Sequence, residues 1–266
     1  MARYDFRSPR LYVDQPLRMG TSVELEAAQT HYLTTVLRLK PHDGVLVFNG
    51  RDGEWRALLN GSSRRSATLV VEQLTRPQTA ATDLHYLFAP LKRARLDYVV
   101  QKAVELGVSC LQPVSTRHTQ ADRVNVARMR ANAIEAAEQC GILNLPEVHE
   151  PVSLAAVLDR LPASRLLVFC DEDAPITDPA AALAGAKSGM KSGMKSEIKS
   201  EAESGPDAPA LAVLIGPEGG FSDDERALIL QRAATVRLAL GPRILRADTA
   251  AVAALALVQT VLGDWR

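Results

Sequence analysis

Hydrophobic residues in the first third of the chain occur in short runs separated by turn-forming residues. Four runs have the composition of β-strands, rich in Val, Leu and aromatic side chains: 10–13, 45–48, 55–59 and 67–71. Gly, Asn and Asp gather between them, as expected for tight turns, and one helical segment lies near residues 28–37. Strands at about ten-residue spacing predict a small β-barrel over residues 1–77.

A different pattern begins at residue 83, where apolar runs alternate with segments of helical periodicity. The predicted strands are 84–89, 110–114, 166–170, 211–215 and 235–239. The predicted helices are 96–106, 124–140, 223–231 and 249–262. Alternating strands and helices predict an α/β domain over residues 78–266, with a mostly parallel sheet covered by helices.

One internal segment fits neither pattern. Residues 185–209 include the imperfect repeat KSGMKSGMKSEIKS, which is made of small and charged residues. Such a composition buries too little apolar surface to offset the entropy of ordering. We expect a disordered insertion in a surface loop, with a lysine-rich RNA tether as the alternative.

The overall composition is that of a globular protein, with 47% apolar residues and 31 basic against 31 acidic side chains. This balance excludes a strongly basic nucleic-acid-binding tail. Residues 1–77 nevertheless hold 11 Lys and Arg against 8 Asp and Glu, whereas residues 151–266 hold 12 against 15. The more basic N-terminal third favours a phosphate-bearing partner.

Neither a membrane anchor nor a signal peptide is expected. The longest uncharged apolar run, 250–258, is far shorter than a bilayer span, and the first fifteen residues contain no apolar core. The 3 cysteines form no C-x-x-C motif and the 5 histidines are scattered. These features predict a cytoplasmic protein without a metal site.

The segment 214–225, LIGPEGGFSDDE, carries the first candidate chemistry. A strand runs into a loop that contains Gly216, Gly219 and Gly220, and glycines let the backbone approach a ligand closely. A helix then begins at a predicted capping box of Ser222 and Glu225. The Lys-Ser/Thr ending of a P-loop is missing, and the carboxylate of Glu218 favours a ligand with positive charge. A tight strand-to-helix turn is the alternative.

Two further segments place basic residues where strands end. In 238–249, Gly241 and Pro242 end a strand before Arg246, and the apolar helix that follows belongs at a subunit interface or at the centre of a core. In 89–119, Lys92 and Arg93 precede a helix and Arg117 follows a strand. Ligands bind at strand ends in α/β sheets, although each arginine taken alone is more typical of a solvated surface.

These segments, with 31–40 (HYLTTVLRLK) and 136–141 (AAEQCG), closely resemble the bacterial 16S ribosomal RNA uridine-N3 methyltransferases. That family, also called the small-subunit methyltransferase E family, belongs to the SPOUT superfamily of knotted methyltransferases. The resemblance runs from about residue 10 to residue 265 and is interrupted by the insertion at 185–209.

The resemblance implies a fold and a function. The N-terminal domain would be a PUA-like β-barrel that grips RNA, and the C-terminal domain an α/β fold with a deep trefoil knot. S-adenosylmethionine would bind among three loops, which follow the strands ending at residues 170, 215 and 239. The implied activity is methylation of N3 of a uridine in 16S rRNA of the small ribosomal subunit. The implied assembly is a homodimer that packs through the knot and the last helix.

The resemblance also implies site residues. Those for the cofactor are Phe169, Cys170, Ile215, Gly216, Pro217, Glu218, Gly219, Gly220, Leu240, Gly241, Ile244 and Leu245. Those for RNA are Arg10, Arg38, Lys40, Lys92, Arg93 and Arg117. Arg246 is the first candidate to stabilise the anion that forms on the uracil ring, with Arg10 and Arg117 behind it. Glu218 and bulk water are alternative acceptors of the N3 proton.

The chain departs from the family pattern at two places. Ile142 to Asn144 stand where one or two arginines are usual, and Asp248 stands where Glu is usual. The first change removes expected RNA contacts. Two other functions therefore stay open: a non-catalytic RNA-binding factor in ribosome assembly, and a knotted methyltransferase for another RNA position.

Overall fold

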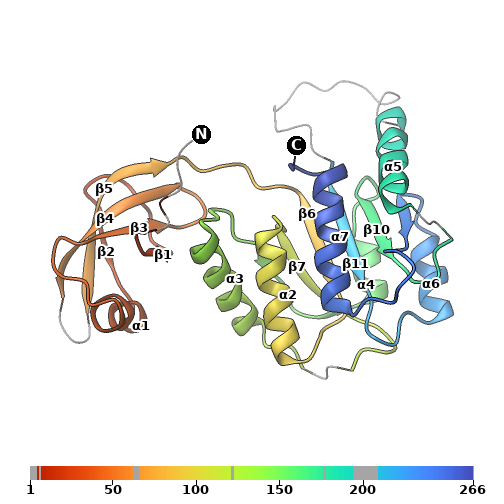
Figure 1. Cartoon of the computed structure of the whole chain (residues 1–266), viewed down its shortest axis with the longest axis horizontal. Helices are drawn as coiled ribbons and strands as arrows, with labels where there is room; N and C mark the ends of the chain where they lie inside the picture. The colour runs from red at the N-terminus through yellow and green to blue at the C-terminus, as the bar shows by residue number, and fades with distance from the viewer. Residues whose placement is uncertain are drawn as a thin grey trace. The chain divides into compact units, whose positions relative to one another are not determined.

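The computed structural model of the chain describes residues 5, 7–62, 66–120, 123–175, 178–193 and 209–265. The chain divides into two compact units, which are coloured by residue number in Figure 1. The first lies within Met1–Ala81 and Ile134–Leu145, and the second within Thr82–Ala133 and Pro146–Arg266. The first unit is therefore built from two segments that are distant in the sequence.

The first unit contains a five-stranded sheet in the order β1-β3-β4-β5-β2. Its strands are β1 (Arg10–Tyr12), β2 (Ser22–Glu24), β3 (Gly44–Phe48), β4 (Glu54–Ser62) and β5 (Ala67–Arg76). The pair β1 and β3 is parallel and the other pairs are antiparallel. Alternate side chains such as Val45, Val47 and Leu69 are fully buried on one face. The four predicted strands are confirmed, whereas β2 was not predicted because it has a single apolar residue.

The predicted helical segment of this unit is confirmed with an unusual backbone. Helix α1 (Ala27–His31) continues without a break into the π-helix η1 (Tyr32–Val36). The amide of Leu37 donates to the carbonyl of Tyr32, 2.9 Å away and five residues back. Arg38 follows with a φ of 56°, a left-handed conformation that residues other than glycine rarely adopt.

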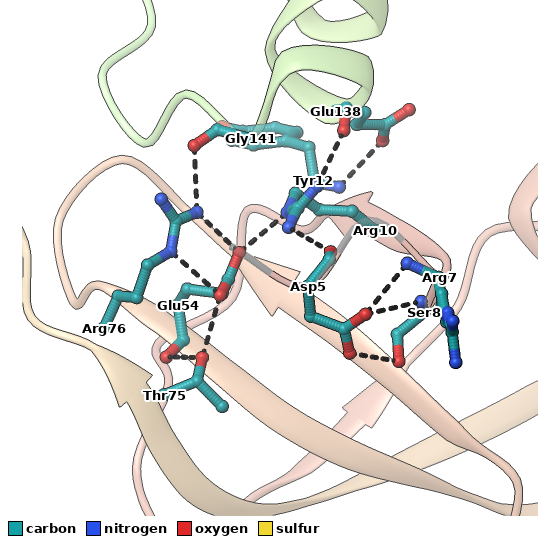
Figure 2. Close-up of polar contacts among 10 residues, drawn as sticks. All are labelled: Asp5, Arg7, Ser8, Arg10, Tyr12, Glu54, Thr75, Arg76, Glu138 and Gly141. Carbon is teal, nitrogen blue, oxygen red and sulfur yellow. Dashed lines mark hydrogen bonds and ion pairs between the residues drawn. The ribbon is translucent and has the colours of Figure 1, made fainter. Parts of the chain in front are cut away.

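A buried carboxylate joins the two segments of the first unit, as Figure 2 shows. Oε2 of Glu54 accepts hydrogen bonds from Nε of Arg10 at 2.7 Å and from Nη2 of Arg76 at 2.6 Å. The same two guanidiniums donate to the backbone carbonyls of Glu138, at 3.2 Å, and Gly141, at 2.9 Å. These bonds attach residues 138–141 to the strands of the first unit.

The second unit contains a seven-stranded sheet in the order β12-β10-β11-β6-β7-β8, with β9 paired to β7. Its strands are β6 (Leu84–Phe88), β7 (Cys110–Ser115), β8 (Glu147–Val148), β9 (Val152–Ser153), β10 (Leu166–Cys170), β11 (Leu211–Ile215) and β12 (Thr235–Leu238). All of these pairings are parallel. The predicted α/β fold with a parallel sheet is thus confirmed.

Helices cover both faces of this sheet. They are α2 (Arg93–Glu105), α4 (Leu154–Arg160), α5 (Pro179–Gly193), α6 (Asp223–Leu230) and α7 (Ala247–Val261). A further helix, α3 (Val126–Cys140), begins in the second unit and ends in the first. Helices α4 and α6 share an apolar core with Leu167, Phe169 and Leu214 on one face. Helices α2 and α7 pack together, and α7 contacts β11, on the other face (Figure 1). Every residue of β11 is buried as a result.

Two helices were not predicted. Helix α4 is only 7 residues long, and α5 begins in the alanine-rich run 180–186, whose helix propensity is high. Because α5 reaches Gly193, the prediction of disorder is wrong for residues 185–193. Residues 194–208 of that segment lie outside the described residues. Among the helices that the structure describes, none has both the length and the apolarity that crossing a membrane requires.

Candidate functional site

A cavity of about 360 Å³ lies at the carboxyl ends of three adjacent strands, β10, β11 and β12. Cys170 pairs with both Ile215 and Leu238, so the three parallel strands end level with one another. The crevice outside such strand ends is where open α/β sheets bind ligands. The volume lies within the range of about 300–1,000 Å³ that is usual for small-molecule sites.

The three loops that follow these strands line the cavity together. The lining residues are Cys170, Asp171, Glu172, Ile215, Gly216, Pro217, Glu218, Gly219, Gly220, Phe221, Leu238, Leu240, Gly241, Pro242, Arg243, Ile244, Leu245, Ala247 and Ala250. All the predicted cofactor residues except one are in this set. The structure therefore brings together loops that are separated by up to 80 positions in the chain.

The exception is Phe169, for which the prediction is wrong. Its side chain is fully buried among the residues that pack helices α4 and α6 on the sheet. Its ring meets the edge of the Phe221 ring, with 5.2 Å between the centroids. Side chains alternate along a strand, so Phe169 faces the core although its neighbour Cys170 faces the cavity.

The glycine-rich loop is both a tight turn and a wall of the cavity. Gly220 has a φ of 66°, and its amide donates to the carbonyl of Pro217 at 2.9 Å. A Cβ at Gly216 would lie 2.5 Å from the Phe221 ring, and a Cβ at Gly219 would lie 3.0 Å from Cβ of His118. A side chain at Gly216 would require the Phe221 ring to move, and one at Gly219 would be tight against His118, so the loop can be a turn and a wall of the cavity at once.

The loop after β7 holds the glycine-rich loop from outside. Nδ1 of His118 lies 3.0 Å from the carbonyl oxygen of Gly219 and 3.2 Å from that of Gly220, so a proton on Nδ1 is shared with both carbonyls. The amide of Arg117 donates to Oε1 of Glu225 at 2.8 Å. The other oxygen of Glu225 completes the predicted capping box with Ser222, which is confirmed. Arg117 itself has an exposed side chain.

The two predicted catalytic residues lie at the rim of the cavity. Glu218 is partly exposed, and its Oε1 lies 2.9 Å from Nη1 of Arg95 in α2. This ion pair was not predicted. Arg246 is the N-cap of α7 and has an exposed side chain. It does not line the cavity, but Leu245 and Ala247 on either side of it do.

A buried ion-pair cluster beside the cavity was missed in the sequence. The carboxylate of Asp171 is fully buried, and its oxygens lie 2.6 Å from Nε of Arg237 and 3.3 Å from Nε of Arg226. Arg226 also contacts Glu172 at 2.8 Å and Asp173 at 3.0 Å. The three carboxylates are close enough to share a cation, but Arg226 already contacts all of them. Three acidic residues directly after a buried strand were the available signal.

Cys170 is not poised to act as a nucleophile. Burial, with the Asp171 carboxylate beside it, raises the pKa of the Cys170 thiol to about 12. The thiol therefore stays protonated at neutral pH, and the protonated form does not attack an electrophile. The chemistry of this cavity depends on shape and on its charged rim.

The predicted RNA-binding residues have different environments. Lys92, Arg93, Arg38 and Lys40 are exposed, and Arg93 lines a separate cavity of about 1170 Å³ in the second unit. For Arg10 the structure argues against RNA contact, because its side chain is only 4% exposed and is paired with Glu54. The sequence could not reveal this, since the two residues are 44 positions apart.

The segment that replaces the expected arginines has a structural role in this chain. The side chain of Asn144 accepts a hydrogen bond from Gln78 at 2.6 Å and donates to Oγ1 of Thr79 at 3.1 Å. The amide of Ile142 donates to the carbonyl of Ala137 at the end of α3. The first unit consists of two chain segments, and Asn144 near the end of the later segment is thus bonded to Gln78 and Thr79 near the end of the earlier one.

Comparisons with known proteins give a consistent result. An RNA methyltransferase domain family matches residues 78–259, and an RNA methyltransferase PUA domain family matches residues 25–72. Ribosomal RNA small subunit methyltransferase E from Rickettsia conorii is 31% identical over 94% of each chain. The protein with the same name from Synechocystis is 30% identical, over 95% of this chain and 78% of its own.

Two solved structures are similar to this chain over nearly its whole length. A ribosomal RNA small subunit methyltransferase E from Neisseria gonorrhoeae, bound to S-adenosyl methionine, has a TM-score of 0.78 and 24% identity, with 98% of this chain and 100% of that chain covered. A putative methyltransferase from Legionella pneumophila, in complex with its bound cofactor SAM, has a TM-score of 0.76 and 27% identity, with 96% and 98% covered.

Proposed function

The chain belongs to the ribosomal RNA small subunit methyltransferase E family, and from this premise we propose that it methylates N3 of a uridine in the RNA of the small ribosomal subunit. It is an S-adenosylmethionine-dependent rRNA methyltransferase. The choice of uridine and of its N3 atom is the proposed part. The observation that carries the proposal is the cavity at the ends of β10, β11 and β12, which is lined by eleven of the twelve cofactor positions that the family resemblance implies.

The residues of this cavity fit S-adenosylmethionine. Gly216 and Gly219 line the cavity, and a Cβ at either position would come close to a neighbouring side chain. At these two positions the backbone itself therefore lines the cavity. Backbone groups of Leu240, Ile244 and Leu245 would hold the adenine edge, and the carboxylate of Glu218 faces a ligand that carries positive charge. The cofactor supplies an electrophilic methyl group when it is bound.

The protein's part in the reaction is positioning and charge stabilisation. Uridine N3–H is a weak acid, so a cation near O2 or O4 of the base stabilises the anion that develops as the proton leaves. We assign this role to Arg246, which is exposed beside the lining residues Leu245 and Ala247. Holding the base in line with the methyl group supplies most of the remaining acceleration.

The N3 proton has two possible acceptors. Glu218 lies at the rim of the cavity, but its carboxylate is paired with Arg95 at 2.9 Å. The carboxylate therefore already has a partner on the protein. This contact favours loss of the N3 proton to water. The role that remains for Glu218 is to face the positive charge of the bound cofactor.

The remaining parts of the proposal concern assembly. Residues 1–77 would act as the RNA-gripping domain and 78–266 as the knotted methyltransferase domain, in line with the boundaries of the two matching families. Two copies would associate through the knot and α7, where Val252, Ala253, Ala256 and Leu257 are only half-buried. The proposed compartment is the cytoplasm, and light scattering of the purified protein tests the dimer.

The test is methyl transfer from labelled S-adenosylmethionine to unmethylated small ribosomal subunits, in parallel with free 16S RNA. Mass spectrometry of the product nucleosides identifies the modified position. Appearance of 3-methyluridine supports the proposal, and the comparison of the two substrates shows which one presents the base. A methyl group on another base or on a ribose would assign a different RNA position.

A further inference from the structure

The first unit contains a cavity of its own, with a volume of about 370 Å³. Its lining residues are Arg7, Ser8, Pro9, Arg10, Tyr32, Leu37, Leu39, Glu138 and Gln139. None of these residues lines the cavity at the ends of β10, β11 and β12. The first-unit cavity therefore needs an explanation separate from cofactor binding.

Two exposed apolar side chains, those of Tyr32 and Leu37, belong to residues that line this cavity. Tyr32 is 38% exposed, Val36 is 59% exposed and Leu37 is 37% exposed, and all three belong to one turn of chain. Leu33 in the same turn is fully buried, so the core fixes the turn while its neighbours face solvent. Clustered exposed apolar side chains mark binding surfaces, and an exposed aromatic ring is the usual platform on which an unpaired base stacks.

The backbone around these residues is unusual in two independent ways. Tyr32–Val36 is a π-helix, and Arg38 immediately after it has a φ of 56°. Both conformations are unfavourable, and both are concentrated at functional sites, where the surrounding structure maintains them. Here they place Tyr32 and Leu37 on the same cavity and leave Arg38 between the lining residues Leu37 and Leu39.

The charges around the cavity favour a nucleotide over an acidic peptide. Arg7 lines the cavity and is exposed, and Arg38 and Lys40 are exposed next in sequence to the lining residues Leu37 and Leu39. All three cations can meet phosphates. Figure 2 shows the side chain of Arg7 directed away from the buried pair of Glu54 and Arg10. Arginine and lysine at the rim of an aromatic pocket are a common arrangement for single-stranded nucleic acid.

Glu138, which is half-buried, is also among the lining residues of the cavity. One of its oxygens accepts the amide of Tyr12 at 2.8 Å (Figure 2). Burial raises the pKa of Glu138, which is the expected effect of a site shielded from water. A carboxylate accepts N–H groups, which unpaired bases carry on their Watson–Crick edges, whereas it repels the carboxylates of an acidic peptide.

We propose that the first-unit cavity binds one unpaired nucleotide of the RNA substrate, with its base against Tyr32, its N–H edge toward Glu138 and its phosphates beside Arg7 and Arg38. The proposal rests on the function proposed above, since the substrate is taken to be RNA. The nucleotide in this cavity is not the one that is methylated, because the cavity shares no residue with the cofactor site. It serves to hold the substrate.

The test compares Tyr32→Ala with Tyr32→Phe in the full-length protein. The probes are a fluorescein-labelled single-stranded RNA hexamer in anisotropy titrations and small ribosomal subunits in methyl-transfer assays. Because stacking on an aromatic ring contributes strongly to the binding of a base, Tyr32→Ala is expected to raise the hexamer Kd and the subunit KM about tenfold or more. Tyr32→Phe keeps the ring, so its hexamer Kd and subunit KM should stay within about twofold of the wild-type values. Because the cavity shares no residue with the cofactor site, neither variant should change the S-adenosylmethionine Kd or kcat.

A matched control is Leu74→Ala, which removes another exposed apolar side chain of the first unit that does not line the cavity. Arg38→Gln is expected to reduce the salt dependence of hexamer binding by about one unit of slope. An unchanged Kd and KM in Tyr32→Ala would overturn the proposal. A loss that Leu74→Ala shares, or one that Tyr32→Phe fails to rescue, would overturn it as well.

The same experiment separates this proposal from the proposed function. If the wild type binds the hexamer through Tyr32 but transfers no methyl group to subunits, the cavity proposal stands and the proposed function fails. If the wild type forms 3-methyluridine and Tyr32→Ala does so with the same KM, the function stands and the cavity proposal fails.

Discussion

Nε of Arg237 lies 2.6 Å from Oδ2 of Asp171, and this contact joins the ends of two strands that border the cavity in which we propose that the cofactor binds. Asp171 directly follows β10, and Arg237 is in β12, the neighbouring strand. Since the Asp171 carboxylate is fully buried, it depends on Arg237 and Arg226 for compensation of its charge. The shape of the cavity and the stability of the sheet edge thus depend on the same carboxylate.

We therefore expect Asp171→Ala to destabilise the protein and to weaken cofactor binding together. Removing one partner of a buried pair leaves the other charges uncompensated, which lowers the free energy of unfolding by about 3 kcal/mol. Urea denaturation measures this change, and calorimetry measures the S-adenosylmethionine Kd. Asp173→Ala is the control: Asp173 contacts the same Arg226 but is 63% exposed, and its loss should change stability by less than about 1 kcal/mol.

Gly219→Val should abolish or strongly weaken cofactor binding. The position is tight, since a Cβ would lie 3.0 Å from Cβ of His118, and the further methyl groups of valine would force the loop that lines the cavity or His118 to move. Overpacking of about 1–3 kcal/mol corresponds to an increase of about 5- to 150-fold in the S-adenosylmethionine Kd. Gly185→Ala in α5 is the control, because a Cβ there meets nothing within 4 Å. Retained affinity in Gly219→Val would mean that the loop is a turn without a ligand role.

Arg246→Ala should retain cofactor binding and lose turnover. If Arg246 stabilises the anion on the uracil ring, its removal should lower kcat by about 100-fold, as the loss of other preorganised charge-stabilising groups does. Single-turnover methyl transfer to small subunits measures the effect. Arg246→Lys keeps a cation and should recover part of the rate, while Arg160→Ala on the exposed side of α4 should have none of these effects. Unchanged turnover in Arg246→Ala would remove this residue from the mechanism.

The Glu54 cluster predicts a pH-dependent contribution to stability. Burial alone would raise the pKa of Glu54, but hydrogen bonds from Arg76, Arg10 and Thr75 outweigh it and hold this pKa below its ordinary value of 4.5. A carboxyl with a lowered folded-state pKa stabilises the protein above its unfolded-state pKa, and this contribution disappears as the pH falls through the folded-state value.

Glu54→Gln should therefore lower the free energy of unfolding by about 3 kcal/mol at pH 7, and the difference from the wild type should shrink as the pH is lowered below 4.5. Urea denaturation across this pH range provides the measurement. The matched control is Glu72→Gln, on the exposed side of β5, which should differ little from the wild type at either end of the range. If the difference in free energy of unfolding between the wild type and Glu54→Gln did not depend on pH, the lowered pKa of Glu54 would be contradicted.

Local sequence patterns predicted the strands that border the cavity well and the buried charges poorly. Strands β10 and β11 are continuous apolar runs of 5 residues that end at Cys170 and Ile215, so their bounds and the loops after them could be read directly. Phe169 was misassigned because neighbouring residues of a strand point to opposite faces. Arg10 was misassigned because its partner Glu54 is distant in the sequence. The pattern of apolar and polar residues along the chain does not show which distant charged residues pair.

The composition of the first unit from two separate segments has a consequence for how the protein is made. Residues 1–81 leave the ribosome well before residues 134–145, and 82–133 of the other unit are synthesised in between. Until the second segment emerges, the guanidiniums of Arg10 and Arg76 lack their carbonyl partners at Glu138 and Gly141. Domains usually fold as units in the order of synthesis. Here the buried guanidiniums of the nascent N-terminal sheet obtain all of their hydrogen-bond partners only after residues 134–145 have been synthesised.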